Sequence, residues 1–317
     1  MNMKKSITII LVLFLGMLLG GCGSDSAEIK EVQQKTIIVK DSVGREVELP
    51  YPLERVAVCN VYNAELITAV GAMDKIVGVD NYIFKDQSGF KNRFTKAQVF
   101  GISQNAMNYE KLAELAPQAV IITGEGTWRD AQDMLDRFGI KVIVINSYYT
   151  DQFGANCRLI GRIFGREAEA EELVAYFTDK LTYIQTQLKD VPRKSLYFEY
   201  RMLGKTAVPG DYFYKMVEYS GADNIFADAK GAQVDQEAII EKNPQYIVKV
   251  ADANAYSSYE PPTIEQKEAI KQELVSRSGW AGIDAVRNDR ILLLSHYLHG
   301  GASKLMGTIY IAKFLYP

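Results

Sequence analysis

Residues 167–189 read EAEAEELVAYFTDKLTYIQTQLK and contain neither glycine nor proline. Apolar side chains recur through this stretch at spacings of three and four residues, at Val174, Phe177, Leu181, Ile184 and Leu188. This spacing places them along one side of an α-helix, so the stretch is predicted to be a single helix with a core-facing stripe. Such a helix spans about 35 Å, because each residue adds about 1.5 Å.

Short apolar runs alternate with helical segments on both sides of this long helix. Strands are expected at residues 36–39, 45–49, 55–59, 76–79, 119–123, 142–145, 195–200, 246–250 and 290–294. Helices are expected at residues 63–71, with Asn63 as the cap, and at 109–116, 128–138, 211–219, 239–242, 264–275 and 302–315. This alternation is typical of βα units around a mainly parallel sheet. The predicted fold class is therefore α/β, with two Rossmann-like α/β lobes joined by one long rigid backbone helix.

A short pattern occurs once in each half of the chain and supports two related lobes. Residues 109–121 read YEKLAELAPQAVI, and residues 236–248 read QEAIIEKNPQYIV. Four positions are identical at an offset of 127 residues: Glu110, Glu114, Pro117 and Gln118 recur as Glu237, Glu241, Pro244 and Gln245. Each copy is predicted to be a short helix, a proline that stops it and a buried strand.

The N-terminus carries an export signal. Lys4 and Lys5 precede an apolar run at residues 7–19, which is too short to be a stable bilayer span. The sequence LGGC that ends at Cys22 resembles a bacterial lipobox, in which the cysteine is lipidated and becomes the mature N-terminus. We therefore expect a lipoprotein signal peptide at residues 1–21 and a polar tether at 22–35; the alternative is an ordinary signal peptide with a chance cysteine. The protein is expected to work outside the cytoplasm, lipid-anchored to the cell membrane, in a periplasm or at the outer cell surface.

The composition indicates a folded globular protein and excludes several classes of partner. Of 317 residues, 48% are hydrophobic and 24% are charged, and the formal net charge is −3. A mildly acidic chain without a basic block is a poor ligand for nucleic acid, whose affinity depends on neutralising phosphates. Three cysteines cannot build a disulfide framework, and two histidines leave little for a bare metal-ion site. We expect a monomer without a cofactor.

Several motifs spread along the chain resemble those of a known family. They are DSVGR at residues 41–45, PLERV at 52–56, NYE at 108–110, GADNI at 221–225 and WAGIDAV at 280–286. Together they resemble the helical-backbone, TroA-like substrate-binding proteins that serve bacterial ABC importers of iron–siderophores, haem and cobalamin. Where that family usually has Pro-Asp before a strand, this chain has Gln118 and Gln245, a change that we expect to be local.

The resemblance implies an architecture and a function. It implies an N-terminal lobe at residues 36–150, a helical connector at 151–190 and a C-terminal lobe at 191–317, with a ligand cleft between the lobes. The protein would capture a metal chelate, namely a ferric siderophore, haem or a corrinoid, and deliver it to the permease dimer of an ABC importer.

Aromatic side chains follow many of the predicted strands, and ligands of α/β proteins usually bind in the loops beyond the strand ends. Aromatic faces suit a flat ring or a catecholate, and an arginine suits ligand carboxylates or iron-bound oxygens. The ligand-binding residues are therefore expected among Tyr62, Tyr82, Trp128, Tyr148, Tyr149, Arg201, Tyr212, Tyr256, His296, Tyr297 and His299, and Tyr200 follows a strand in the same way. Any single tyrosine is equally open to a packing or surface role.

The two histidines, His296 and His299, lie in one segment after a predicted strand. A bare transition-metal ion needs three or four ligands from both lobes, so this pair argues against a bare-ion site. Two roles stay open for the imidazoles: an axial ligand to haem or cobalamin, or hydrogen bonding to the loop backbone.

The repeated glutamates, Glu110 and Glu237, occupy equivalent places in the two halves. In the family that the chain resembles, one glutamate per lobe in these motifs meets arginines on the two permease subunits, which implies permease docking for both. The alternative is that each carboxylate only stabilises the first turn of its helix through the helix dipole. Glu114 and Glu241 are expected to be ordinary solvated helix charges.

Catalysis finds little support in the sequence. Residues 124–126, GEG, follow a predicted strand, but the third glycine of a dinucleotide fingerprint is missing. Cys59 and Cys157 are open to three roles, a catalytic thiol, a disulfide or buried free thiols, and their apolar strand and helix favour the last. We expect the protein not to be an enzyme. The alternative is an exported α/β lipoprotein with an enzymatic or structural role and no transport ligand.

Overall fold

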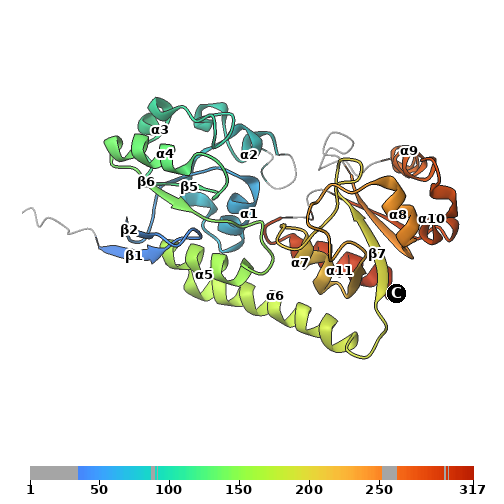
Figure 1. The fold of residues 1–317 in the computed structure, drawn as a ribbon. Coiled ribbons are helices and arrows are strands. Elements are labelled where there is room, and N and C mark those ends of the chain that lie inside the picture. The colour runs from blue at the N-terminus through green and yellow to red at the C-terminus, as the bar shows by residue number, and fades with distance from the viewer. Residues whose placement is uncertain (1–34, 87–89, 91, 252–262, 296–297, 299) are drawn as a thin grey trace, which may run out of the picture. The chain divides into compact units, whose positions relative to one another are not determined.

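The computed structural model describes residues 35–86, 90, 92–251, 263–295, 298 and 300–317 (Figure 1). Several residues that were assigned a role from the sequence lie outside the described residues: Cys22, Tyr256, His296, Tyr297 and His299. In the part of the chain that is described, no helix combines the length and apolar character needed to cross a membrane.

The described chain begins with an antiparallel hairpin of β1 (Thr36–Lys40) and β2 (Glu46–Pro50), as predicted. The turn between them is built around the carboxylate of Asp41, which accepts hydrogen bonds from the backbone N–H and the guanidinium of Arg45. Asp41 also accepts the N–H of Val144 at 3.3 Å. The motif at residues 41–45 therefore fastens the hairpin to the end of a strand in the first large sheet.

The first large sheet is parallel throughout and has the strand order β4-β3-β5-β6. Its strands are β3 (Val56–Val58), β4 (Ile76–Val79), β5 (Ala119–Ile122) and β6 (Lys141–Val144). The helices between them are α1 (Val61–Ala69), α2 (Asn81–Lys85), α3 (Tyr109–Leu115) and α4 (Trp128–Leu135). Alternate residues of β5 face opposite sides, so Ile121 joins one hydrophobic cluster and Val120 another. Both faces of this sheet are therefore covered.

The second large sheet is also parallel, with the order β10-β9-β7-β8. Its strands are β7 (Lys194–Glu199), β8 (Ala222–Asn224), β9 (Tyr246–Val250) and β10 (Ile291–Leu294). Its helices are α7 (Tyr214–Tyr219), α8 (Gln236–Lys242), α9 (Ile264–Val275), α10 (Asp284–Arg287) and α11 (Lys304–Leu315). Phe198 of β7 faces a cluster with residues of α7 and α11, and Tyr197 faces the opposite cluster with residues of α8 and α9.

The two sheets have the same topology. In each, the first strand in the chain lies between the second and the third, and the fourth lies beyond the third, giving β4-β3-β5-β6 and β8-β7-β9-β10. This order is that of a doubly wound sheet. It confirms the predicted fold class of two Rossmann-like α/β lobes.

The internal repeat is visible in the details of both lobes. Helices α3 and α8 each end in a left-handed residue, Ala116 with φ 47° and Asn243 with φ 42°. Just beyond, the Gln118 side chain accepts the N–H of Arg55 at 3.1 Å, and the Gln245 side chain accepts the N–H of Ser195 at 3.2 Å. Each glutamine thus ties the start of its strand to the start of the neighbouring central strand.

The connector consists of α5 (Phe153–Phe164) and α6 (Glu167–Gln187). Helix α6 begins at the predicted residue and has 21 residues instead of 23, with Val174, Phe177 and Ile184 of the predicted stripe buried. Helix α5 lies within the predicted helical connector at 151–190, although its own bounds were not predicted; it packs against α6 and stacks the ring of Phe153 on that of Phe177 at 4.0 Å. Gly161 allows this approach, because an added Cβ would lie 2.5 Å from that of Ala170.

Four helix starts differ from those predicted. Helix α8 begins at Gln236 instead of residue 239 and α11 at Lys304 instead of residue 302; the other two are α1 and α7. Asn60, not Asn63, caps α1, because its Oδ1 accepts the N–H of Tyr62 at 2.9 Å and Asn63 is buried inside the helix. Helix α7 begins at Tyr214 because residues 211–213 form a turn in which Asp211 accepts the N–H of Tyr214 at 2.8 Å. Strand β8 was not predicted, since three residues are too few to show an alternation.

Candidate functional site

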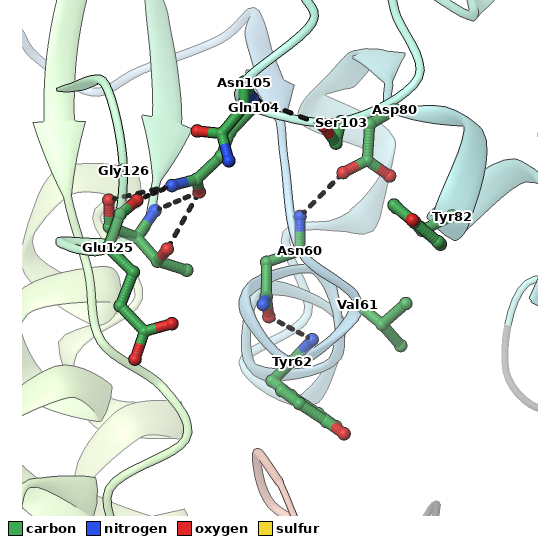
Figure 2. A pocket seen from close by; sticks show the side chains of 11 residues that line it. Asn60, Val61, Tyr62, Asp80, Tyr82, Ser103, Gln104, Asn105, Glu125 and Gly126 are labelled. Atoms are coloured by element: carbon green, nitrogen blue, oxygen red, sulfur yellow. Dashed lines mark hydrogen bonds between the residues drawn. The ribbon is translucent and has the colours of Figure 1, made fainter. Parts of the chain in front are cut away.

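The candidate site lies at the carboxyl ends of the strands in the first sheet. In a doubly wound sheet, ligands bind outside the carboxyl ends of the strands at the point where the strand order reverses. Here that point lies between β3 and β5, and it is followed by Asn60 and by residues 123–126. Asn60 has a positive φ of 78° and donates its N–H to Asp80 Oδ2 at 3.1 Å (Figure 2).

A cavity of about 340 Å³ opens at this point (Figure 2). Its lining consists of Asn60, Val61, Tyr62, Asp80, Tyr82, Ser103, Gln104, Asn105, Thr123, Glu125 and Gly126. Gln104 holds its two sides together: its Oε1 accepts the N–H and the hydroxyl of Thr123 at 3.0 and 2.8 Å, and its Nε2 donates to the carbonyl of Glu125. The wall is therefore polar and braced before any ligand arrives.

A second cavity, of about 300 Å³, continues the first. It is lined by Asn60, Tyr62, Thr123, Glu125, Tyr148, Tyr200, Arg201 and Tyr212, so it shares four lining residues with the first. Together we call the two cavities the hollow. Tyr200 and Arg201 follow β7 of the second sheet, so strand ends from both sheets contribute to it. The rings of Tyr148 and Tyr212 meet edge to face, with centroids 5.7 Å apart.

Three phenols of the hollow, those of Tyr62, Tyr148 and Tyr212, are held in their protonated form. Burial raises the pKa of Tyr62 well above its ordinary value. Burial, followed by the charge of Glu125, also raises the pKa of Tyr148. For Tyr212 the pKa is raised to about 12, first by burial and then by Tyr200 and Glu125. These groups are therefore neutral hydrogen-bond donors and aromatic surfaces at neutral pH.

A buried lysine positions two of these tyrosines through hydrogen bonds to their backbone carbonyls. Lys304 of α11 is 1% exposed, and its Nζ donates to the backbone carbonyls of Tyr148 and Tyr212. Burial lowers the pKa of Lys304 to about 7, against the attraction of Asp211 and Asp151. The amine thus ties the loop after β6 to the loop before α7.

The start of α11 is also anchored to α1 through Glu65. The Glu65 carboxylate accepts the backbone N–H of Ser303 at 2.8 Å. Burial raises the pKa of Glu65 from 4.5 to about 7, although the hydrogen bonds from Ser303 act in the opposite direction.

This shift predicts how stability depends on pH. Because the folded-state pKa of Glu65 lies above the unfolded-state value, its stabilising contribution is present below pH 4.5 and is lost as the pH rises towards 7. Between pH 5 and pH 8, the free energy of unfolding of the native chain should fall relative to that of Glu65→Gln by on the order of 3 kcal/mol. Urea unfolding of both proteins at the two pH values measures this difference. Glu114→Gln, which removes an exposed carboxylate, is the control, and parallel profiles for native and Glu65→Gln chains would contradict the prediction.

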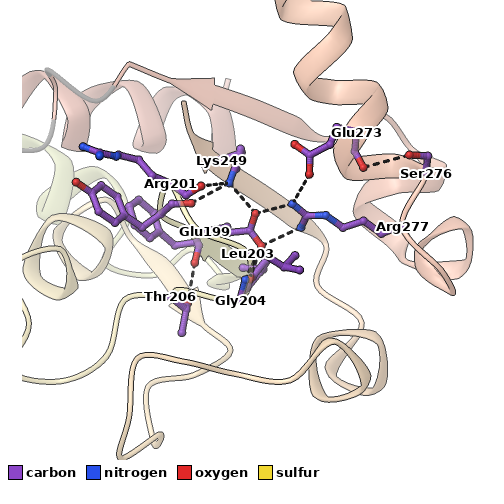
Figure 3. A network of polar contacts seen from close by, with 12 residues as sticks. Glu199, Arg201, Leu203, Gly204, Thr206, Lys249, Glu273, Ser276 and Arg277 are labelled. Atoms are coloured by element: carbon purple, nitrogen blue, oxygen red, sulfur yellow. Dashed lines mark hydrogen bonds and ion pairs between the residues drawn. The ribbon is translucent and has the colours of Figure 1, made fainter. Parts of the chain in front are cut away.

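A buried ion network fixes the end of β7 (Figure 3). The Glu199 carboxylate accepts Lys249 Nζ at 2.8 Å and both terminal nitrogens of Arg277 at 2.9 Å. Burial alone would raise the pKa of Glu199, but the hydrogen bonds and charges of Arg277 and Lys249 hold it below its ordinary value. Lys249 Nζ also donates to the carbonyls of Tyr200 and Arg201, at 2.9 and 3.1 Å. The network therefore sets the backbone that presents Tyr200 and Arg201 to the hollow.

The structure brings together most of the described residues that were expected to bind ligand. Those that line the hollow are Tyr62, Tyr82, Tyr148, Arg201 and Tyr212, together with Tyr200. Tyr149 lines a neighbouring cavity of about 310 Å³, together with Asp151, Asp211 and Lys215. Trp128 is placed elsewhere: it is buried in the core of the first lobe, and the guanidinium groups of Arg45 and Arg129 lie over its ring, 4.3 and 4.2 Å from the centroid.

Several lining residues were not found from the sequence. They are Asn60, Asp80, Ser103, Gln104, Asn105, Thr123 and Glu125. Two of them carried a usable signal, because Asn60 and Glu125 lie within three residues of the ends of the buried strands β3 and β5. Glu125 also lies within the GEG stretch, which was considered only as a nucleotide motif. Ser103, Gln104 and Asn105 lie in a long irregular segment without periodicity.

The described thiols and acids do not form a reactive cluster. Cys59 and Cys157 are free and buried, as expected, and burial raises the pKa of Cys59 well above its ordinary value and that of Cys157 to about 12. Among the described residues, no three His, Cys, Asp or Glu side chains are grouped so as to hold a metal ion.

The repeated glutamates lie on the surface at equivalent places. Glu110 and Glu237 are exposed in the first turns of α3 and α8, after the caps Asn108 and Asp235. Glu114 lies one turn further along α3 and pairs with Lys111 at 2.8 Å.

Known proteins are similar to this chain over nearly its whole length. One curated relative is YvrC of Bacillus subtilis, an ABC transporter substrate-binding lipoprotein that is 25% identical over 99% of this chain and 98% of its own. The petrobactin-binding protein YclQ of Bacillus subtilis is 22% identical over 96% of both chains. A vitamin B12-binding protein of Vibrio vulnificus is 21% identical over 69% of this chain and 80% of its own.

Two solved structures share the fold. A periplasmic solute-binding protein from Veillonella parvula matches with a TM-score of 0.71 and 20% identity, over 89% of this chain and 87% of that one. CeuE of Helicobacter pylori, in a complex with Ni and His, matches with a TM-score of 0.69 and 19% identity over 89% of both.

The family model described as periplasmic binding protein matches residues 56–298, which include both large sheets. It is a family of binding proteins rather than enzymes, in agreement with the expectation from the sequence. The chain belongs to the periplasmic binding protein family.

Proposed function

We propose that this protein is the extracytoplasmic substrate-binding lipoprotein of an ABC importer and that it captures a metal chelate in the hollow. The observation that carries the proposal is the convergence of Tyr62, Tyr148, Tyr200, Tyr212 and Arg201 at the strand ends of both sheets. Aromatic faces with a few polar groups are typical of sites for bulky organic ligands. On this proposal Cys22 is the lipidated N-terminus, and the protein delivers its ligand to a permease dimer.

The chemistry of the hollow supports a chelate over a bare ion. Protonated phenols are poor ligands for a metal, because a metal binds the phenolate, but they donate hydrogen bonds to the oxygens of a chelate that already surrounds its metal. The relatives named for petrobactin and vitamin B12 support a ferric siderophore or a corrinoid. Haem rests only on the resemblance seen in the sequence.

Binding of such ligands is directly measurable. The purified full chain is titrated with ferric siderophores, cobalamins and haem. One of these classes is expected to show a changed absorption spectrum on binding and to quench the fluorescence of the tyrosines in the hollow. Isothermal titration should give tight binding for that class and weak binding for free zinc and manganese. Tight binding of the free ions, with none for any chelate, would contradict the proposal. Reproducible substrate turnover without ligand affinity would favour the enzymatic alternative instead.

We also propose that Glu110 and Glu237 dock the protein onto the permease. The matching positions of the two exposed carboxylates, on equivalent helices of lobes with the same topology, support this role, because a permease dimer offers two similar contact sites. Helix-dipole stabilisation accounts for each glutamate singly, but it does not require both to fall at the same place in the repeat.

A further inference from the structure

The charges that line the hollow are not balanced. Among the described lining residues, the carboxylates belong to Asp80 and Glu125, and the cation is Arg201. Asp80 is 2% exposed and already accepts the N–H groups of Asn60 and Ile83 at 3.1 and 2.9 Å. Glu125 is exposed and lines both cavities. The carboxylate that a bound molecule meets is therefore that of Glu125.

Glu125 acts on three of the tyrosines around it. After burial, its negative charge is a cause of the raised pKa of Tyr148 and Tyr149, and it contributes to that of Tyr212. Its carboxylate is thus within electrostatic reach of all three rings. In Figure 2 its side chain extends away from the contacts that Gln104 makes with the backbone of the same loop. The backbone of Glu125 is braced, and its carboxylate lines the hollow, where it also forms a side-chain hydrogen bond with Tyr148.

The buried cations near the hollow are committed to other partners. Lys304 Nζ is bound to the backbone carbonyls of Tyr148 and Tyr212, and burial favours its neutral form. Lys249 is paired with Glu199. Neither amine is available to a ligand, so among the described lining residues the exposed charges are those of Glu125 and Arg201.

We propose that the hollow selects chelates that present a positively charged or uncharged edge to Glu125 and disfavours anionic complexes, a specificity that rests on the proposed chelate-binding function. An anionic edge is repelled by a carboxylate in a cleft whose low-dielectric walls concentrate the field. An ammonium edge binds the same carboxylate through a charge-assisted hydrogen bond. The phenols donate hydrogen bonds to the chelate and do not replace its ligands on the metal.

A series of chelates that share one metal core and differ in charge at one end tests this directly. A linear ferric trihydroxamate with a terminal amine carries +1; acetylation of the amine gives 0 and succinylation gives −1, with the same metal core. A corrinoid pair, cyanocobalamin and its monocarboxylic acid derivative, repeats the step from 0 to −1. Each is titrated calorimetrically into the full chain in detergent, into Glu125→Gln, and into Glu114→Gln, which removes an exposed carboxylate of α3 outside the hollow.

In the native chain, affinity is expected to fall about tenfold for each step towards negative charge. Glu125→Gln should reduce each step to less than about threefold by the same reasoning, whereas Glu114→Gln should keep the native order. A series that binds the native chain with a flat or reversed charge order overturns this proposal and leaves the chelate-binding function standing. If the native chain binds neither series nor any other chelate tested for the proposed function, that function fails and this specificity fails with it; if it binds only anionic chelates, this specificity alone is overturned.

Discussion

The double variant Glu110→Arg with Glu237→Arg is expected to abolish stimulation of the importer's ATPase while leaving ligand affinity unchanged. Both carboxylates lie on the surface in the first turns of α3 and α8, in helices other than those that line the hollow. If each meets an arginine of one permease subunit, charge reversal places like charges in contact, which costs several kcal/mol at each site. ATPase activity of the transporter in proteoliposomes, with the ligand-loaded protein added in excess, measures the effect.

Matched charge reversals one turn further along the same helices provide the control. Glu114→Arg with Glu241→Arg adds the same total charge to the same helices but should reduce stimulation only slightly. Each single docking variant should retain partial activity, because the other lobe still engages its subunit. Normal stimulation by the Glu110 and Glu237 double variant, or equal loss in the control, would place docking elsewhere.

The second large effect is expected from Glu199→Gln, which breaks the ion network at the end of β7. The Glu199 side chain is fully buried, and those of Lys249 and Arg277 are 7% and 12% exposed. Removing this buried negative charge leaves two nearly buried cations near each other, with only the exposed Glu273 carboxylate still paired to Arg277, so the free energy of unfolding should fall by about 3–5 kcal/mol. Urea or thermal unfolding of the purified variant measures the loss.

Two further variants show whether the loss comes from the uncompensated charges. Glu273→Gln removes the other carboxylate that pairs with Arg277, but its side chain is 65% exposed, so the expected change is within about 1 kcal/mol. Adding Lys249→Met to Glu199→Gln should recover part of the stability, because one unpaired buried cation is gone. If Glu199→Gln is as stable as the native chain, the network does not support β7.

The same network links stability to the site. Lys249 donates hydrogen bonds to the carbonyls of Tyr200 and Arg201. When Glu199→Gln removes the anionic partner of Lys249, the backbone at Tyr200 and Arg201 is expected to shift. Chelate affinity of Glu199→Gln, measured well below its unfolding temperature, is therefore expected to be weaker than that of the native chain. The position of Arg201 thus depends on a lysine 48 residues away in the sequence.

Much of the fold was predictable because its signals are local. The apolar stripe of α6, the proline that ends each short helix of the repeat, and the buried runs of β5 and β9 all act over a few residues. Two halves with the same order of strands and helices then fold into two sheets with the same topology. The errors arose where local signals are weak, as at Asn63, or absent, as in the three residues of β8.

For the binding site, the sequence predicted the type of side chain and the strand ends where they lie, but not which of these residues line it. Ligands of parallel α/β sheets bind beyond the carboxyl ends of the strands, so tyrosines that follow strands were expected to gather at a site. The same rule did not distinguish Tyr148, which lines the hollow, from Trp128, which lies in the core. Burial decides between them, and it depends on contacts such as that of Arg45 with the Trp128 ring, made by residues 83 positions apart.

By itself, the sequence determined two α/β lobes, a long helix between them and a surface glutamate repeated in each lobe. The tertiary structure alone decided that Glu125 faces the phenols, that Lys304 ties Tyr148 to Tyr212, and that Glu199 is neutralised by two cations. The physical reason is range. Helical and strand periodicity act between near neighbours in the chain, whereas the protonation and position of a buried group are set by whichever distant residues the fold packs against it.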